Sequence, residues 1–397
     1  MVKRLACLLL VLTAPLAASA GQVLNGVDVL ERDGFRQLAG QRVGLITNHT
    51  GRTRDGRSTI QLLHNAPGVD LVRIFSPEHG IAGKLDIPVV ADSSEAATGI
   101  PIISLYGESR RPSAAALAGV DTLVFDIQDI GTRFYTYIST MGNAMAAAAE
   151  HDVRFVVLDR PNPINGNSVA GPVLDDGLQS FVGFHTLPIR HGMTTGELAM
   201  MFRAELGLDL DLEIVPVEGW HRHEYFDDTG LPWVNPSPNM RSLRAAILYP
   251  GIGLLETTNI SVGRGTATPF ELIGAPWLDA EALAIALHEL ALPGIAFTPV
   301  RFTPDASTFA DEACQGVRFT IIDREALEPV RTGLGIATVL RRDYPERWQT
   351  ERYIRLLGNA ATLDALLAGR DVADIEAQYA AGLAAFSARR KPFLLYE

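Results

Sequence analysis

The chain has 397 residues, a formal net charge of −12 at pH 7 and 47% hydrophobic residues. An acidic chain without a basic tract argues against nucleic acid as a partner. No apolar run beyond the N-terminal one is long enough to cross a membrane. The length and the apolar content favour two domains with large cores.

Residues 1–20 have the pattern of a signal peptide. A short basic start precedes the apolar run Leu5–Ala17, and Ala18–Ala20 fits a small-residue cleavage site. Cys7 lies inside the apolar run, which argues against a lipoprotein. Cleavage would leave Cys314 alone, so we expect no intramolecular disulfide. The chain is therefore expected to be exported, to the periplasm or the exterior of a bacterial cell.

The first part of the chain alternates strand and helix patterns, which predicts a parallel sheet covered by helices on both faces. The expected strands are Arg42–Thr47, Val69–Phe75, Ile100–Leu105, Thr122–Ile127 and Arg154–Leu158. The expected helices are Gly56–His64, Ser113–Ala118 and Thr132–Glu150. No GxGxxG motif follows the first strand, so we expect a Rossmann-like α/β sheet without a nicotinamide or flavin cofactor.

The second part has a more mixed pattern. A loop rich in Pro, Gly and Asn, Pro161–Pro172, reads as a hinge, and we place the first domain at 21–164 and the second at 165–397. The expected elements are a helix over Thr194–Leu206 capped by Thr194 or Thr195, strands at Leu212–Val217 and Val317–Ile322, a helix capped by Asp279, and helices over most of Glu346–Ala388. The stretch Pro232–Pro276 reads as irregular, which is usually functional in a compact domain.

The turn after the second expected strand carries the first catalytic candidates. Glu78 and His79 stand between Pro77 and Gly80, which fix the geometry of the turn. Ligands of open α/β sheets bind at the carboxyl ends of the strands, and a carboxylate beside an imidazole is a natural acid/base pair. The alternative is a surface turn whose acid faces water.

Two later strand ends repeat the arrangement. Asp126 ends one strand, and Asp159, Arg160 and Asn162 follow another. We expect them to share one polar cleft with Glu78. The alternative for Asp159 and Arg160 is a pair that clamps the hinge. Asp129 has the pattern of a cap for the next helix.

The helix expected after Asp126 opens with Arg133, Tyr135 and Tyr137. An Arg near a helix N-terminus can hold a carboxylate, and tyrosines can pack against a sugar face. An ordinary amphipathic helix start explains the tyrosines equally well.

Polar residues of the second part suggest a site for a hydroxylated ligand. The candidates are His191, Asn239, Glu256, Asn259 and Arg264. The glycines around Arg264 do not form a P-loop, because no Lys-Ser/Thr ending follows them. The sequence also lacks HExxH and paired-Cys motifs, so we expect no catalytic metal.

Eight strings, in one order along most of the chain, resemble the exo-β-N-acetylmuramidase family, the NamZ-like glycosidases long catalogued as a domain of unknown function. They are GLITNHTG (44–51), FSPEHGI (75–81), SLYG (104–107), FDIQDIGTRFYTY (125–137), LDRPNPI (158–164), RHGMTTGELA (190–199), SPNM (237–240) and the run 249–277. The resemblance implies a Rossmann-like domain followed by a mixed α/β domain, with the active-site cleft between them.

The resemblance also implies an exo-acting glycosidase without a cofactor. It would release N-acetylmuramic acid (MurNAc) from the non-reducing end of peptidoglycan fragments such as MurNAc-GlcNAc, in cell-wall turnover. We expect Glu78 to donate the proton, His79 to orient it, and Asp126 or Glu256 to be the second acid. The expected substrate contacts are Asn48, Arg133, Tyr135, Tyr137, Asp159, Arg160, Asn162, His191, Asn239, Asn259 and Arg264.

The arginines Arg133 and Arg160 are expected to face the lactyl carboxylate of MurNAc. Two alternatives stay open at this point. A non-catalytic periplasmic binding protein for cell-wall sugars would also be exported and cofactor-free, but it needs no Pro-framed Glu–His pair. A metal-dependent hydrolase on a similar sheet is the other. The sequence leaves the retaining, inverting and substrate-assisted routes equally open.

Overall fold

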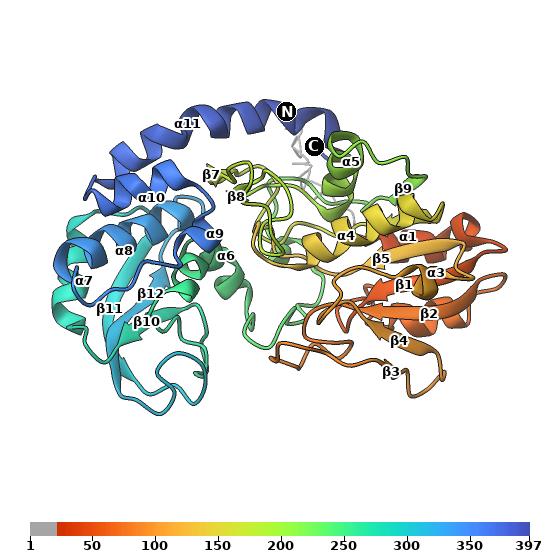
Figure 1. The fold of residues 1–397 in the computed structure, drawn as a ribbon, viewed down its shortest axis with the longest axis horizontal. Coiled ribbons are helices and arrows are strands. Elements are labelled where there is room, and N and C mark those ends of the chain that lie inside the picture. The colour runs from red at the N-terminus through yellow and green to blue at the C-terminus, as the bar shows by residue number, and fades with distance from the viewer. Residues whose placement is uncertain (1–21) are drawn as a thin grey trace, which may run out of the picture.

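The computed structural model describes residues 22–397 (Figure 1), and the expected signal peptide lies outside them. A seven-stranded sheet dominates the first part, in the order β3-β4-β2-β1-β5-β6-β9. Neighbouring strands run parallel, except that β3 is antiparallel to β4. The expected Rossmann-like, mostly parallel sheet is confirmed.

The strands of this sheet, apart from the two-residue β3, are rich in Val, Ile, Leu and Phe. They are β1 (Arg42–Thr47), β2 (Asp70–Ser76), β3 (Ser93–Ser94), β4 (Pro101–Ser104), β5 (Thr122–Asp126), β6 (Arg154–Leu158) and β9 (Leu212–Val215). The central strand β5 is buried along its whole length, as expected for a parallel strand covered on both faces. The strand order reverses between β1 and β5, which is where ligands of such sheets commonly bind.

Helices cover both faces of the sheet. Helices α1 (Gly26–Arg32) and α2 (Thr59–His64) contribute to one core, and α3 (Ala114–Leu117), α4 (Tyr137–Glu150) and α5 (Thr195–Glu205) contribute to the other. Adjacent residues of one strand serve different cores: Val124 belongs to the first and Phe125 to the second. This follows from the alternation of side chains along a strand.

The first sheet extends beyond residue 164, where we expected its domain to end. Strand β9 pairs with β6 after a crossover through α5. The loop Pro161–Pro172 leads into a hairpin of β7 (Ala170–Val173) and β8 (Pro188–Arg190), and the chain then returns to the sheet. The expected boundary is therefore too early, because the composition of a loop does not tell whether a later strand rejoins the sheet.

The second part is mixed α/β, as expected. Its antiparallel sheet has the order β10-β12-β11. Its elements are α6 (Leu243–Ile252), η3 (Gly253–Thr257), β10 (Leu272–Ala275), α7 (Ala280–Glu289), β11 (Ile295–Phe302), β12 (Cys314–Ile321), α8 (Pro329–Asp343), α9 (Ile354–Leu357) and α10 (Ala360–Leu367). Short 3-10 turns elsewhere are η1 (Arg36–Leu38), η2 (Phe226–Thr229) and η4 (Lys391–Phe393). Asp279 caps α7 as expected, accepting from the Ala282 N–H at 3.0 Å.

The stretch Pro232–Pro276, expected to be irregular, contains α6, η3 and β10. Helix α6 packs against α8 where two glycines meet. A methyl group on Gly251 would lie 1.8 Å from the carbonyl oxygen of Pro329, and one on Gly333 would lie 2.4 Å from the carbonyl oxygen of Gly251. Only glycine allows this approach. Because η3 follows α6 directly, this contact also fixes the position of η3.

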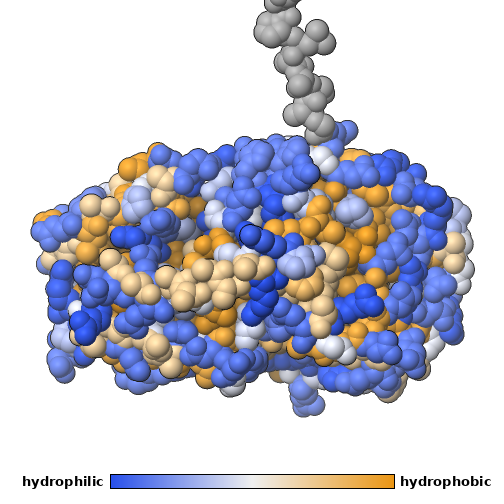
Figure 2. Space-filling model, turned by 90° about the horizontal axis from the view of Figure 1, so that it is seen from above, coloured by the Kyte–Doolittle hydropathy of each residue, from blue (hydrophilic) through white to orange (hydrophobic). Residues whose placement is uncertain are grey.

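Helix α11 (Val372–Arg389) crosses the top of both parts (Figure 1). It buries Ile375, Tyr379 and Phe386. Its outward residues are mainly alanines, and Figure 2 shows a pale, weakly apolar band on this side of the molecule. None of the described helices, α11 included, is long and apolar enough to cross a membrane.

The C-terminal tail returns to the first part. Arg390 Nη1 donates to the Gly192 carbonyl at 2.6 Å, the Leu395 N–H donates to Glu197 at 2.8 Å, and the Tyr396 hydroxyl donates to Asp159 at 2.6 Å. The last residues therefore contact the first turn of α5 and the carboxyl end of β6.

The fully buried side chain of Arg133 ties the two parts together. Its Nη1 donates to the carbonyl oxygens of Pro172 (3.1 Å) and Leu187 (3.0 Å). Its Nη2 donates to those of Leu356 (2.6 Å) and Leu357 (2.8 Å), at the end of α9. Burial lowers the pKa of Arg133 to about 9. The guanidinium thus joins the β7–β8 hairpin to α9.

Replacing Arg133 with Met should destabilise the fold. The substitution keeps an apolar stem but leaves four carbonyl oxygens without this donor, so we expect the free energy of unfolding to fall by roughly 3–5 kcal/mol. Urea denaturation followed by circular dichroism measures this. Arg36→Met is the control, because the Arg36 side chain is 76% exposed and its loss should change little. Equal midpoints for both variants would contradict the clamp.

Candidate active site

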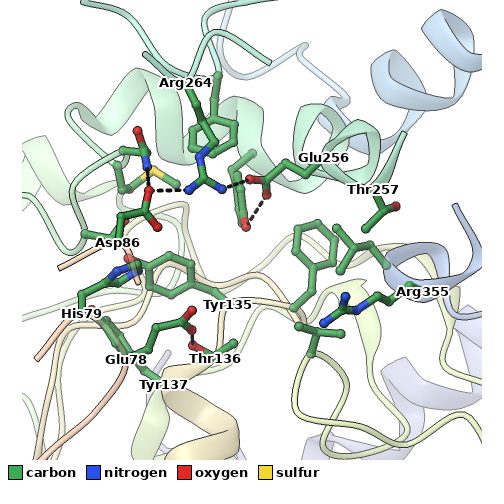
Figure 3. Close-up of a pocket in the computed structure, with 18 residues that line it drawn as sticks. Glu78, His79, Asp86, Tyr135, Thr136, Tyr137, Glu256, Thr257, Arg264 and Arg355 are labelled. Carbon is green, nitrogen blue, oxygen red and sulfur yellow. Dashed lines mark hydrogen bonds and ion pairs between the residues drawn. The ribbon is translucent and has the colours of Figure 1, made fainter. Parts of the chain in front are cut away.

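A cavity of about 240 Å³ lies between the end of β2 and the second part (Figure 3). From the first part, the loop after β2 and residues 134–137 line it; from the second part, the α6–η3 region and α9 do. The lining residues are Glu78, His79, Asp86, Phe134, Tyr135, Thr136, Tyr137, Val182, Ser237, Asn239, Met240, Tyr249, Glu256, Thr257, Arg264, Phe270, Arg355 and Leu356. The cavity lies where the resemblance implied a cleft.

The turn after β2 is rigid. The Gly80 N–H donates to the Pro77 carbonyl at 3.1 Å, which puts Glu78 and His79 at the two central positions. His79 has φ +69°, a conformation uncommon for a residue with a side chain. Two bonds to Leu85 hold it there: the ring Nδ1 lies 2.7 Å from the Leu85 carbonyl, and the Leu85 N–H donates to the His79 carbonyl at 3.2 Å. Strain of this kind clusters at functional sites.

Glu78 points into the cavity from this turn (Figure 3). The Thr136 hydroxyl donates to its Oε2. Burial, and then the Glu78 carboxylate, raise the pKa of Tyr106 to about 12, so Tyr106 stays a neutral phenol beside Glu78. Glu78 is therefore a carboxyl group with a fixed direction and hydroxyl neighbours.

A second carboxyl group faces the cavity from the other part. Glu256 lies on η3, where it accepts from the Tyr249 hydroxyl at 3.0 Å and from Arg264 Nη1 at 3.1 Å. Burial raises the pKa of Glu256, although Arg264 and Tyr249 favour its charged form. This carboxyl group can thus hold or release a proton closer to neutral pH than an exposed one.

Arg264 also binds Asp86, a residue of the first part (Figure 3). Its Nη2 donates to Asp86 at 2.5 Å, and Asn239 donates to the same oxygen at 3.1 Å. Although burial alone would raise it, Arg264 keeps the pKa of Asp86 below its ordinary value. Asp86 directly follows Leu85, and the backbone of Leu85 is hydrogen-bonded to His79. His79 therefore also positions the loop that carries Asp86.

Aromatic rings form much of the remaining wall. Tyr135 lies edge-on to Tyr137 (5.0 Å between ring centroids) and to Tyr249 (6.0 Å), and Tyr249 lies edge-on to Phe270 (4.7 Å). The Tyr137 hydroxyl donates to the Pro236 carbonyl at 2.6 Å, which fixes that ring. Such rings offer an apolar surface with polar tips, which suits a sugar face.

Asp126 and Arg160 are not among the cavity-lining residues. Arg160 Nε donates to Asp126 at 2.6 Å, and the Thr59 hydroxyl donates to the other Asp126 oxygen at 2.5 Å. Both side chains are buried, at 0% and 5% exposure. Our expectation that Asp126 and Arg160 share one cleft with Glu78 is wrong, because this internal ion pair turns both away from the cavity.

Asp159 and Asn162 have anchoring contacts instead of cavity positions. Asp159 accepts from the Thr194 hydroxyl (2.7 Å) and from the Gly196 N–H (2.8 Å) at the start of α5. Asn162 donates to the Met193 carbonyl at 3.0 Å. Asp159 therefore has a structural role, as in the hinge-clamp alternative. Its partner is the start of α5, however, and not the Arg160 guanidinium.

Three more expected substrate contacts, Asn48, Arg133 and Asn259, lie away from the cavity lining. Arg133 is the clamp described above. Gly131 has φ +79°, Thr132 forms a bridge with Arg190 of β8, and the Arg133 N–H donates to the Ile189 carbonyl. The chain is therefore not yet helical here, and α4 begins only at Tyr137, five residues later than expected. Asn48 accepts from the Thr50 N–H at 2.9 Å, and Asn259 binds the backbone of Arg347 and Gln349, both at 2.8 Å.

His191, the remaining candidate, is fully buried. The Met193 N–H donates to its Nδ1 at 3.2 Å, and its Nε2 lies 3.8 Å from Asp129. Burial, with Arg390 and Arg190, lowers the pKa of His191 to about 3, so the ring is neutral. Asp129 accepts from the Gly131 N–H at 2.7 Å and caps that turn, not the helix as expected.

The structure thus brings together seven of the expected site residues: Glu78, His79, Tyr135, Tyr137, Asn239, Glu256 and Arg264. Sequence reasoning missed Asp86, Thr136, Tyr249 and Arg355 as site residues. Thr136 and Tyr249 lie inside strings that the resemblance used. Asp86 and Arg355 stand in segments without a motif, so nothing in the sequence singled them out.

Two family models cover the described chain almost completely. The N-terminal model of exo-β-N-acetylmuramidase NamZ matches residues 43–244, and the C-terminal model matches residues 247–396. The chain belongs to the NamZ family. The junction between the two models also lies beyond β9, in agreement with the extent of the first sheet.

One curated relative and two solved structures are similar to most of the chain. The chain is 43% identical over 383 residues to the peptidoglycan β-N-acetylmuramidase NamZ of Bacillus subtilis (strain 168), covering 96% of this chain and 92% of that protein. It resembles two crystal structures of DUF1343 family proteins from Bacteroides fragilis NCTC 9343. One has a TM-score of 0.89 and 37% identity, covering 95% of this chain and 99% of that one. The other has a TM-score of 0.78 and 30% identity, covering 94% and 99%.

The side chains that could bind a metal ion are scattered in this NamZ-family chain, as far as the structure describes it. Within residues 22–397, no three His, Cys, Asp or Glu side chains gather in a way that could hold a metal ion. The cavity carboxylates have other partners: Glu256 and Asp86 share Arg264, and Glu78 accepts from Thr136.

Asp129 should make stability depend on pH. Burial raises its pKa to about 7, against 3.8 for an exposed Asp. A raised carboxyl pKa gives stability that is complete below the unfolded value and is lost as the pH rises through about 7. In the wild type, the free energy of unfolding should fall by on the order of 3–4 kcal/mol between pH 4 and 8 for this reason. Asp129→Asn should not show this fall, so the variant should be more stable than the wild type at pH 8. Urea unfolding at several pH values measures this, and a parallel pH dependence of both proteins would contradict it.

Proposed function

We propose that this protein is an exo-β-N-acetylmuramidase, which hydrolyses the bond between a non-reducing terminal MurNAc and the next sugar of a peptidoglycan fragment. The family, and the printed activity of the Bacillus subtilis relative, support the reaction. The structural observation that carries it is the placement of Glu78. A carboxyl group on a strained, doubly held turn faces a cavity whose opposite wall carries a second carboxyl group, Glu256.

Two carboxyl groups on facing walls are what glycoside hydrolysis needs. We assign the proton donor to Glu78: its proton passes to the glycosidic oxygen as the bond from that oxygen to C1 of MurNAc breaks. Water then supplies the oxygen that ends on C1, and its proton passes to a carboxylate. Of the two second acids that we considered, Glu256 lines the cavity and Asp126 does not, so we assign the second role to Glu256.

The size of the cavity supports action at a chain end. At about 240 Å³ it lies below the usual range of ligand pockets, roughly 300–1,000 Å³. Such a space suits a single sugar and not several units of a glycan strand. The aromatic wall of Tyr135, Tyr137 and Tyr249 provides the face against which one ring can pack.

We further propose that the protein is exported and acts in the periplasm or outside the cell. The support is the signal-peptide pattern of residues 1–20, with cleavage before Gly21. N-terminal sequencing of protein purified from the cell envelope fraction tests this. An intact Met1 would overturn it.

Incubation with the disaccharide MurNAc-GlcNAc tests the activity directly. Free MurNAc and GlcNAc should appear in equal amounts, measured by liquid chromatography and mass spectrometry. Intact polymeric peptidoglycan should release no internal disaccharides. Binding of the disaccharide without turnover would instead favour the sugar-binding alternative.

Replacing Glu78 with Gln should keep the fold and lower turnover by on the order of 10²–10⁴-fold, because positioned proton transfer contributes about that much. The loss should shrink as the pKa of the leaving group falls, because a good leaving group needs little protonation. His79→Ala should cost less, since it removes a positioning group. The exposed Glu108→Gln is the matched control. A folded E78Q protein with near wild-type turnover on MurNAc-GlcNAc would remove Glu78 from this role.

A further inference from the structure

The charged side chains of the cavity differ in whether other residues of the protein already bind them. Glu78, Asp86 and Glu256 supply carboxyl groups, and Arg264 and Arg355 supply guanidinium groups. Arg264 binds both Glu256 (3.1 Å) and Asp86 (2.5 Å), and these carboxylates raise its pKa although burial alone would lower it. The charge of Arg264 is therefore used within the protein.

Arg355 is different. It is exposed, and within residues 22–397 its side chain forms no ion pair or hydrogen bond. Figure 3 shows it reaching from α9 into the cavity, on the side away from His79 and Asp86. A planar guanidinium with its donors free can bind a carboxylate with two parallel hydrogen bonds.

Hydrogen bonds from Arg133 fix the backbone next to Arg355. The carbonyl oxygens of the next two residues, Leu356 and Leu357, accept from Arg133 at 2.6 and 2.8 Å. Tyr353, two residues earlier, is fully buried. The stem of Arg355 thus starts from a rigid turn, and only its side chain is free to meet a ligand.

MurNAc differs from GlcNAc by a lactyl ether that ends in a carboxylate. The cavity repels such an anion through its carboxyl groups, so a cation not already paired is required to bind it. Arg133 and Arg160, which we expected in this role, are buried in contacts with carbonyl oxygens and with Asp126.

We propose that Arg355 binds the lactyl carboxylate of MurNAc and so selects MurNAc over GlcNAc. This inference rests on the proposed function, because it names the group that recognises its substrate. Arg355 is a specificity residue here, and the reacting atoms are left to Glu78 and Glu256.

The test compares three variants on three substrates. Arg355→Met removes the charge, Arg355→Lys keeps a charge without the planar fork, and Arg352→Met is the control, an exposed Arg that does not line the cavity. The substrates are 4-nitrophenyl β-MurNAc, its lactyl amide and 4-nitrophenyl β-GlcNAc. Arg355→Met should lower kcat/KM on β-MurNAc on the order of 10-fold or more and leave the two uncharged substrates unchanged. Arg355→Lys should recover part of the loss, and Arg352→Met should show none.

Calorimetric binding of free MurNAc separates this inference from the proposed function. A wild-type protein that binds MurNAc through Arg355 but turns nothing over would overturn the function and support the inference. If Arg355→Met lost kcat/KM equally on all three substrates, or lost none on β-MurNAc, the inference would be overturned. Turnover by the wild-type protein would still support the proposed function. A wild-type protein that neither binds nor hydrolyses MurNAc would overturn both.

Discussion

The relation between the two walls of the cavity depends on one buried guanidinium. Arg133 stands inside the segment that supplies Phe134, Tyr135 and Thr136 to one wall. Two of its hydrogen bonds end on α9, which supplies part of the other wall. A buried cation is costly unless hydrogen bonds replace its water shell. Here four carbonyl oxygens accept from Nη1 and Nη2 of Arg133. The site geometry is therefore held by backbone groups, which cannot be lost by substitution of a partner side chain.

The acidic residues at the strand ends and in the cavity also divide into two kinds, those that stabilise the fold and those that can meet a substrate. Asp126 and Asp159 have their oxygens filled by Arg160, by hydroxyl groups and by the start of α5. Glu78 and Glu256 keep a side toward the cavity. A carboxyl group whose acceptor sites are filled by donors of the protein and that does not reach the cavity has little left to offer a substrate. Glu256, like Asp126, accepts from an arginine and a hydroxyl group, so it is the position at the cavity that distinguishes the two kinds of acid.

Features encoded by short stretches of sequence were predictable. Strand β6 has the expected bounds, Thr194 and Glu197 form a reciprocal cap, and the turn at Glu78 and His79 follows from Pro77 and Gly80. The position of a residue at a strand end predicts that it lies at the carboxyl edge of the sheet. It does not predict whether the second part of the chain forms a cavity next to that residue. The covering comes from residues 237–270 and 355–356, far away in sequence. Arg160 at its strand end, and Arg133 in the loop after β5, were therefore misplaced, and Arg355 had no local pattern to reveal it.

The C-terminal tail gives the molecule an order of assembly. Asp159, at the end of β6, is completed by the hydroxyl of Tyr396, and Glu197 at the start of α5 by the N–H of Leu395. Synthesis proceeds from the N-terminus, so the sheet made first acquires its last polar partners only when the final residues of the chain are available. These two contacts span 198 and 237 positions, and contacts that close such large loops form late. A nascent chain therefore lacks these contacts, and the finished fold is a property of the whole chain and not of its first domain.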